Sequence, residues 1–297
     1  MAHIDGTRLP GPCGPAILAA RVQGRNILLD IDDLRGLWRR SLLAYPDGFR
    51  DTTTQVHWLQ GLRLYADLRQ SEIRPSFAGV GCLRDLRAAH IAWLSRQEAF
   101  AGHLVRAGDS FEWRRHLDYQ PPSNTIDAGR LWLEDGMMKE EGRDIPYIEH
   151  WHREPTRAGP VAGLQLRDAV TGAPGAVVVV GDAFMYARGR AVDLPAGTRL
   201  HDLVADAGDL RAAQDLLDCE VSYGIRRGDT WTVKGSTLPY KEGRPLALTG
   251  GGRPLRHLST QDEDAEGRAM TRTWTIVACE GEIEGLWPAL ELYSVSP

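Results

Sequence analysis

Hydrophobic and polar residues alternate in short runs along much of the chain, a pattern typical of β-strands. Such runs, rich in Val, Thr and aromatic residues, occupy residues 36–70, 102–119, 130–153, 161–188, 219–248 and 274–279. Turn residues separate many of them, as at Pro46-Asp47-Gly48, Gln60-Gly61, Thr171-Gly172 and Gly228-Asp229. Many short strands with turn signals between them predict a β-barrel or a β-sandwich.

A few segments depart from this alternation. Leu83, Leu86, Ile91 and Leu94 recur at three- to four-residue spacing and predict a helix over 83–98. Residues 200–218 predict a second helix, interrupted near Gly208. Gly175 to Tyr186 is expected to be one strand, and its unbroken part Val177 to Val180 predicts burial on both faces. Asn26-Ile27-Leu28-Leu29 is either an early strand or a connector, and Gly250 to Gly267 is expected to be a polar loop.

The chain is long enough for one large domain or two smaller ones. Its 297 residues fit two domains of about 150 residues each. Pro155 to Pro160 is the expected boundary, which gives an N-terminal domain of residues 1–156 and a C-terminal domain of residues 157–297. The two halves have similar strand content but no clear internal repeat.

Composition narrows the classes of partner. The net charge of −5, with arginines scattered among acidic residues, argues against binding of nucleic acid, which needs a surplus of Lys and Arg. The four cysteines are far apart, so we expect free thiols in a reducing compartment and no zinc site. No apolar run is long enough to span a membrane, and Met1 to Leu9 lacks a signal-peptide pattern. We therefore expect a cytoplasmic protein without a membrane partner.

Polar and aromatic side chains gather in one predicted hairpin. Its first strand is expected to run from Leu131 to Gly142, and its second from Tyr147 to Arg153. Because a strand has period two, Tyr147, Glu149, Trp151 and Arg153 share one face of the second strand. In the first strand, Glu140 is expected to share a face with Met138, Gly136 and Trp132. We interpret these two faces as the wall of a pocket.

The two glutamates of this hairpin are the candidate acid/base groups. If the strands pair simply, Glu140 lies near Glu149, and two adjacent carboxylates would raise the pKa of one of them. Arg153 and Tyr147 would then orient an anionic or carbonyl group, and Trp151, Trp132 and Met138 would contact the substrate. The alternative is that each glutamate forms a structural ion pair with an arginine. Register cannot be determined from the sequence, so both alternatives remain open.

Three further groups of polar residues have either a functional or a structural role. Tyr65, Asp67 and Arg69 share a face opposite Leu64, Ala66 and Leu68, and form either a pocket wall that contacts substrate or an outer surface. His150 and His152 would need a third ligand, from His57, His90 or His116, to bind a metal, so solvent-facing histidines are favoured and no metal is expected. Tyr223, Arg226, Tyr240 and Glu242 form a second polar group, for which a structural role is favoured.

Several residues together resemble a known family, the Hri-type family first met in fungi, which has bacterial relatives. The resemblance rests on Trp58-Leu59, Asp135-Gly136 with Glu140 and Gly142, Glu149 and Trp151, Ala176 to Val180, and Val221-Ser222-Tyr223-Gly224. Arg96-Gln97-Glu98 with Phe100-Ala101-Gly102 is the more specific part, and the resemblance covers roughly residues 36–245. It implies a mostly β fold of two calycin, lipocalin-like antiparallel β-barrels with a few short helices. It implies no settled activity.

Two main hypotheses about function follow, and the oligomeric state is left open. The first is a lyase or isomerase that needs no cofactor and acts by acid/base chemistry on a small, partly apolar or aromatic molecule. P-loop, GxSxG and strand-GxGxxG-helix motifs are absent. The alternative is a carrier that holds a small hydrophobic ligand without turnover. An unpaired, buried Glu149 beside a cavity would favour the enzyme, and a saturated ion pair would favour the carrier. A barrel filled with side chains would instead indicate an interaction module.

Overall fold

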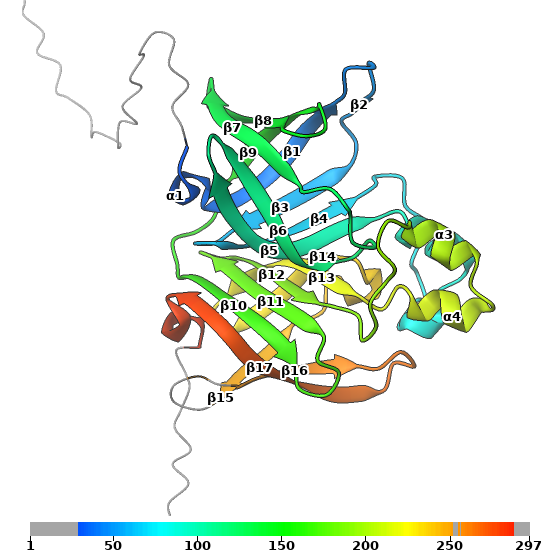
Figure 1. Ribbon diagram of the computed structural model, residues 1–297. Helices are drawn as coiled ribbons and strands as arrows, with labels where there is room; N and C mark the ends of the chain where they lie inside the picture. Colours follow the sequence, from blue (N-terminus) through cyan, green and yellow to red (C-terminus); the bar gives the residue numbers. More distant parts are fainter. Residues whose placement is uncertain (1–28, 252–254, 256, 288–297) are drawn as a thin grey trace, which may run out of the picture.

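The chain folds into two stacked antiparallel β-sheets, with short helices gathered mainly at one side (Figure 1). The computed structural model describes residues 29–251, 255 and 257–287. Of the predicted early segment Asn26-Ile27-Leu28-Leu29, all but Leu29 lies outside the described residues. The mostly β fold class with a few short helices is confirmed.

The first sheet closes into an eight-stranded barrel. Its strands follow one another in chain order, and the last returns to pair with the first, from Leu37 opposite Glu154 to Ala44 opposite Ile148. Pairing is shortest between residues 110–118 and 128–134, where the ladder consists of Phe111 opposite Gly129 and Glu112 opposite Ala128. The strands are β1 (Gly36–Ala44), β3 (Gln55–Gln60), β4 (Leu64–Gln70), β5 (Glu98–Ala107), β6 (Ser110–Asp118), β7 (Ala128–Glu134), β8 (Met137–Gly142) and β9 (Ile148–Glu154). The two-residue β2 (Arg50–Asp51) pairs antiparallel with the end of β1.

The second sheet is a half-barrel of eight strands in the order β14-β13-β12-β11-β10-β17-β16-β15. Among the described residues, an isolated bridge between Thr232 and Pro245 connects the two edges, without a continuous ladder. The strands are β10 (Val161–Asp168), β11 (Pro174–Val180), β12 (Ala183–Arg188), β13 (Glu220–Arg227), β14 (Thr230–Ser236), β15 (Ala247–Gly251), β16 (His257–Glu263) and β17 (Ala269–Gly281).

The facing sides of the two sheets share one hydrophobic core. Strand β11 lies against β3 and β4, so Val178 packs in the same cluster as Leu64 and Leu68. Val177 and Val179 point to the other side, into the half-barrel. The prediction of a strand buried on both faces is therefore confirmed. The first sheet ends before Pro155 and the second begins after Pro160. Because the two sheets share a core, the division into two domains stays a prediction.

The helices cover one end of this shared core. The predicted helix over 83–98 is shorter than expected, because it consists of η1 (Leu83–Asp85) and α2 (Ala88–Leu94), and β5 already begins at Glu98. The second predicted helix is interrupted as expected, between α3 (Leu200–Ala205) and α4 (Leu210–Asp215), which lie side by side (Figure 1). The remaining short helices are α1 (Ile31–Leu34), η2 (Pro239–Lys241) and η3 (Ile283–Leu286).

Two tight turns divide segments that the sequence analysis treats as single strands. Asp135 and Gly136 both have positive φ, +51° and +81°, and join β7 to β8 in a two-residue hairpin. This is the Asp-Gly pair that such turns favour. Gly181 has a φ of +63° in the turn between β11 and β12, and a Cβ there would lie 1.9 Å from the Arg157 carbonyl oxygen. The expected continuous strands Leu131 to Gly142 and Gly175 to Tyr186 are therefore wrong.

The expected polar loop Gly250 to Gly267 is also wrong in part. Residues 257–263 form β16, which pairs with β17 along its whole length, from His257 opposite Thr275 to Glu263 opposite Ala269. The polar residues misled the prediction because Leu258 and Thr260 alone supply the buried face of this strand.

Candidate functional site

Aromatic side chains fill one end of the first barrel. Trp58 is 1% exposed, and its ring centroid lies 5.7 Å from that of Trp113 and 5.5 Å from that of Trp151. Trp38 stacks on Trp58, with the guanidinium of Arg153 lying 4.6 Å over the Trp38 ring. No ligand-sized space is found at this end in the described part of the chain.

The other end of the barrel is hollow. A cavity of about 1100 Å³ opens there and continues along segments 120–128 and 189–194. Its wall combines aromatic residues (Tyr45, Phe49, Trp113, Tyr147), aliphatic residues (Leu43, Leu117, Ile126, Ile145) and charged residues (Arg40, Asp51, Arg69, Glu98, Arg115, Asp118, Asp127, Glu149). Ligand pockets of about 300–1,000 Å³ are usual in proteins, so this space is ample for a small molecule.

Glu149 lies on the cavity wall with only 3% of its surface exposed. Its Oε1 accepts a hydrogen bond from Arg40 Nη1 at 2.6 Å, and Arg40 Nη2 donates to Asp51 Oδ2 at 2.9 Å. Burial raises the pKa of Glu149, although the charges of Arg69 and Arg40 act in the opposite direction. Glu149 is thus the middle of a buried ion-pair network rather than an unpaired base.

A second arginine, Arg69, lies beside this network. Its Nε donates to Asp67 Oδ1 at 2.9 Å, and its Nη1 lies 3.7 Å from Glu98 and 3.9 Å from Glu149. Burial raises the pKa of Asp67, with Arg69 acting against that rise. The Tyr65, Asp67 and Arg69 face therefore points into the barrel, as the pocket-wall alternative requires.

Glu140 lies directly opposite Glu149 in the β8–β9 ladder, so the simple pairing of the hairpin is confirmed. Its Oε1 accepts from the Tyr147 hydroxyl at 2.6 Å, and its Oε2 accepts from Trp151 Nε1 at 3.1 Å. Burial and then the charge of Glu149 raise the pKa of Glu140 well above its usual value. Glu140 does not line the cavity itself, but Tyr147 does, and the phenol connects the two.

The structure brings eight of the ten predicted site residues together. Glu149, Tyr147 and Arg69 line the cavity, while Glu140, Trp151, Met138, Tyr65 and Asp67 are inside the barrel next to it.

Trp132 and Arg153 lie elsewhere, so their predicted places in the pocket are wrong. The Asp135-Gly136 turn reverses the alternation, which places Leu131 opposite Glu140 and leaves Trp132 opposite Lys139 on the outer side. Arg153 is exposed at the filled end of the barrel, where its guanidinium donates to the Asp33 carbonyl oxygen.

Sequence reasoning missed part of the wall. Arg40 was not singled out, although it stands in a strand of apolar residues where an inward charge needs a partner. Arg115 shares a face with Phe111 and Trp113 in the sequence pattern, and its guanidinium lies 3.5 Å from the Phe100 ring centroid. It pairs with Asp118 and Asp127. The alternation of Phe111, Trp113 and Arg115 was the available signal for this position.

The other candidate groups do not form sites. His150 is half-buried and His152 exposed, and no group of three metal-ligating side chains is found within the described residues. Tyr223 stacks on His57 at 4.5 Å, while Arg226 donates to the Gly285 and Leu286 carbonyl oxygens. Glu242 instead accepts from Arg74. These residues serve separate structural contacts.

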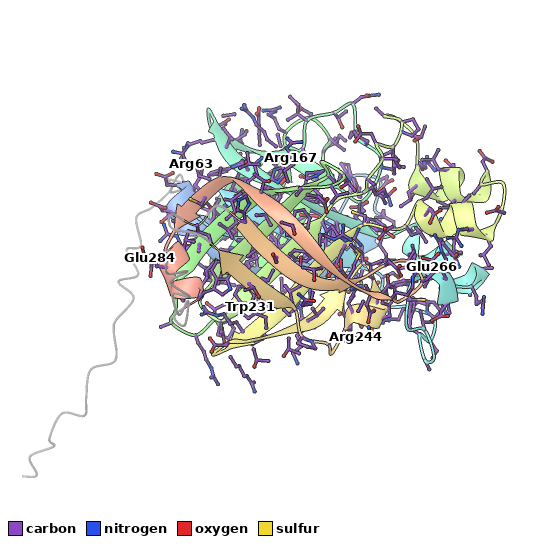
Figure 2. The ribbon with its side chains drawn as sticks, turned by 90° about the horizontal axis from the view of Figure 1, so that it is seen from below. Arg63, Arg167, Trp231, Arg244, Glu266 and Glu284 are labelled. Carbon is purple, nitrogen blue, oxygen red and sulfur yellow. The ribbon has the colours of Figure 1, made fainter. Side chains whose placement is uncertain are left out.

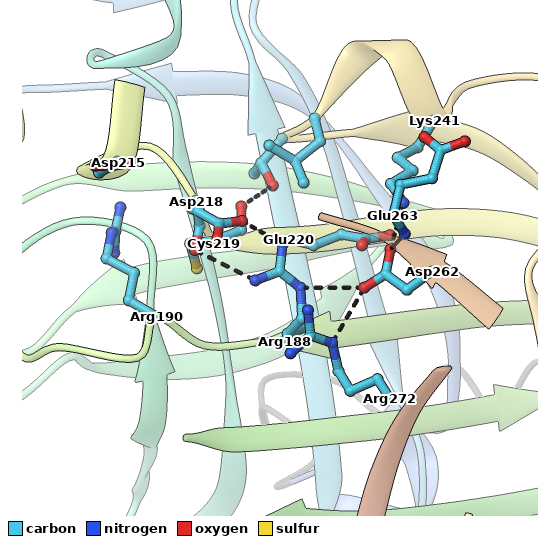
Figure 3. A network of polar contacts seen from close by, with 12 residues as sticks. Arg188, Arg190, Asp215, Asp218, Cys219, Glu220, Lys241, Asp262, Glu263 and Arg272 are labelled. Carbon is cyan, nitrogen blue, oxygen red and sulfur yellow. Dashed lines mark hydrogen bonds and ion pairs between the residues drawn. The ribbon is translucent and has the colours of Figure 1, made fainter. Parts of the chain in front are cut away.

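The half-barrel interior is packed rather than hollow. Trp231, labelled in Figure 2, and Trp274 are buried there among aliphatic side chains. The half-barrel also contains a buried network of ion pairs. In it, Asp262 pairs with Lys241 at 2.5 Å and with Arg272 at 3.1 Å, and lies 3.9 Å from Arg188 (Figure 3). Glu220 is buried beside it. The space lined by Glu220 and Asp262 is only about 30 Å³, room for about one water.

No protein-family model matches the chain, and no curated protein matches it. Among solved structures, it is similar to the uncharacterized protein YLR301w from Saccharomyces cerevisiae, at 13% identity and a TM-score of 0.46, over 82% of this chain and 98% of that chain. In the described part of the chain, every helix is too short or too polar to cross a membrane.

Proposed function

We propose that this chain is a small-molecule binding protein whose ligand occupies the hollow end of the first barrel. The single observation that carries this proposal is the cavity of about 1100 Å³, whose wall combines aromatic, aliphatic and buried charged side chains. Ligand pockets commonly combine apolar and aromatic walls with polar groups that fix the orientation of the ligand. The proposal includes a calycin-type carrier related to the Hri-type family and a cytoplasmic location.

The pairing of Glu149 supports binding without turnover. A general base must reach the proton that it removes, and its basicity falls when a guanidinium already holds the carboxylate. Arg40 donates to Glu149 at 2.6 Å inside the barrel. The ion pair then serves to hold the wall in place, and the ligand is recognised by the surfaces around it.

Binding is tested with N-phenyl-1-naphthylamine, a neutral apolar fluorophore, titrated into the full chain. We expect saturable binding of one probe per chain. Tyr45 lies in the wall, with its ring centroid 6.0 Å from that of Phe49 and 6.3 Å from that of Tyr147. Tyr45→Ala should weaken binding about tenfold, since an aromatic contact contributes up to about 1.5 kcal/mol.

The matched control is Tyr223→Ala, which removes a half-buried tyrosine that stacks on His57 outside the cavity. It should leave the affinity for the probe unchanged. Absence of saturable binding to the folded wild-type chain would contradict the proposed function. Equal weakening by both substitutions would contradict the location of the site.

A second candidate, an acid/base lyase or isomerase, is favoured by one observation. The Tyr147 phenol lies between the cavity and Glu140, whose pKa is raised, and this gives a path for a proton. Proton exchange at the α-carbons of phenylacetone in D₂O, followed by NMR, separates the two candidates. A binding protein leaves the exchange rate at that of buffer. If the wild type accelerates the exchange and Tyr147→Phe lowers the exchange rate at least tenfold, the chain is an acid/base enzyme and the proposed function is wrong.

A further inference from the structure

The wall of the cavity contains more carboxylates than guanidinium groups. Arg40 pairs with Asp51 and Glu149, and Arg69 lies within 4 Å of Asp67, Glu98 and Glu149. Arg115 pairs with Asp118 and Asp127. Three guanidinium groups thus face five carboxylates of the wall and the buried Asp67 next to it. Over the whole lining, eight carboxylates stand against six guanidinium groups. At neutral pH this arrangement makes the local potential negative.

The arginines at the rim of the cavity do not reverse this balance. Arg190 donates to the Leu216 and Tyr119 carbonyl oxygens, both at 2.6 Å, and Arg114 pairs with Glu112. Arg96 is hydrogen-bonded to the His201 ring at 2.8 Å. All three side-chain nitrogens of Arg190 donate to protein carbonyl oxygens, whereas Arg114 and Arg96 are exposed to solvent.

Two titratable residues of the wall have a raised pKa, mainly because they are buried. The pKa of Tyr45 is raised by burial and then by the charges of Glu149 and Glu98. The pKa of Asp118 is raised by burial, with Glu98 adding to the rise and Arg115 opposing it. A positive charge placed in the cavity would relieve the repulsion between these carboxylates.

Glu149 also has an acceptor to spare. Its Oε1 is bonded to Arg40, while no hydrogen bond to its Oε2 is found within the described residues. Arg40 and Arg115 each use both terminal nitrogens in hydrogen bonds. Arg69 donates from Nε to Asp67, and within the described residues its terminal nitrogens make only the longer contacts to Glu98 and Glu149.

Rings suited to a cation lie at the same end of the barrel. Tyr45 contacts both Phe49 and Tyr147, and all three line the cavity. The faces of such rings attract an ammonium group that has lost part of its hydration. The two observations, excess carboxylate and clustered rings, are independent and point to the same ligand chemistry.

We propose that the ligand is an organic cation: a protonated amine or quaternary ammonium group carried by an apolar or aromatic body. The cationic group lies against Glu149 and the rings of Tyr45 and Tyr147, and the apolar body fills the rest of the cavity. This inference rests on the proposed function, because it names the ligand class of the same site.

Three indoles of similar size test the charge of the ligand in isothermal titrations with the full chain at pH 7. Tryptamine is a cation, tryptophol is neutral and indole-3-propionate is an anion. We expect tryptamine to bind at least tenfold more tightly than tryptophol, and indole-3-propionate to bind most weakly. Tryptamine should also displace N-phenyl-1-naphthylamine.

Variants assign the preference to particular carboxylates. Glu149→Gln should reduce the affinity for tryptamine to that for tryptophol. Glu98→Gln removes a carboxylate whose side chain is 57% exposed, so it should fold normally and weaken tryptamine binding a few-fold. The matched control is Glu220→Gln, which removes the charge of a buried glutamate in the half-barrel and should leave the affinity for tryptamine unchanged.

The outcomes separate the inference from the proposed function. Binding of the neutral probe, together with equal or tighter binding of tryptophol or indole-3-propionate than of tryptamine, would overturn the cation and leave the binding function intact. Failure of tryptamine to displace the bound neutral probe would do the same. Failure of every probe, the neutral one included, would overturn the proposed function itself.

Discussion

Arg40→Leu is expected to lower the free energy of unfolding by about 3–5 kcal/mol at pH 7, the usual cost of removing one partner of a buried ion pair. The Arg40 and Glu149 side chains are each 4% exposed, so water cannot replace the lost guanidinium. Asp51 loses the same partner but keeps the Thr53 and Thr54 backbone donors. Chemical denaturation monitored by tryptophan fluorescence measures the loss.

The loss should depend on pH. Burial already raises the pKa of Glu149, and removal of Arg40 takes away one of the charges that lower it. A carboxyl whose folded pKa is raised binds more protons in the folded than in the unfolded state, so stability falls as pH rises above the ordinary carboxyl pKa. The variant should therefore lose less stability at pH 5 than at pH 8.

Two controls accompany this variant. Arg40→Leu combined with Glu149→Leu should recover most of the loss, because replacing both partners of a buried pair is often nearly neutral. Arg157→Leu removes a side chain that is 76% exposed and 3.7 Å from Asp182, and should change stability by less than about 0.5 kcal/mol. A loss below 1 kcal/mol in Arg40→Leu, the same at both pH values, would contradict a buried ion pair.

Val178→Asp is expected to lower the free energy of unfolding by more than about 3 kcal/mol, because it buries a carboxylate without a partner between the two sheets. Val178 is fully buried, and a Cβ on Gly61 of the first sheet would lie 3.2 Å from its Cγ1. Denaturation measures the loss. If the two halves can fold independently of each other, Val178→Asp should unfold in two transitions where the wild type unfolds in one.

The matched control is Val277→Asp in β17, whose side chain is 52% exposed. It should change stability by less than about 0.5 kcal/mol. Equal stability of the two variants would contradict a shared core between the sheets.

The sequence by itself determined the strand content, the approximate break between the two sheets and the hairpin that carries Glu140 and Glu149. Period-two alternation and turn residues act locally, so they can be recognised without knowledge of the fold. The unbroken apolar run Val177 to Val180 also predicted correctly that this strand is buried on both faces. One local signal was overlooked: recognition of the Asp135-Gly136 turn would have placed Trp132 on the outer side.

Only the tertiary structure decided which charges meet. Arg40 reaches Glu149 across 109 residues because β9 returns to pair with β1, and barrel closure cannot be deduced from local alternation. The same closure leaves one end filled by Trp38, Trp58 and Trp151 and the other end hollow. It also decided that five carboxylates of the wall and the buried Asp67 face three guanidinium groups there, since ion pairing inside a barrel depends on which strands are neighbours, not on which residues are near in sequence.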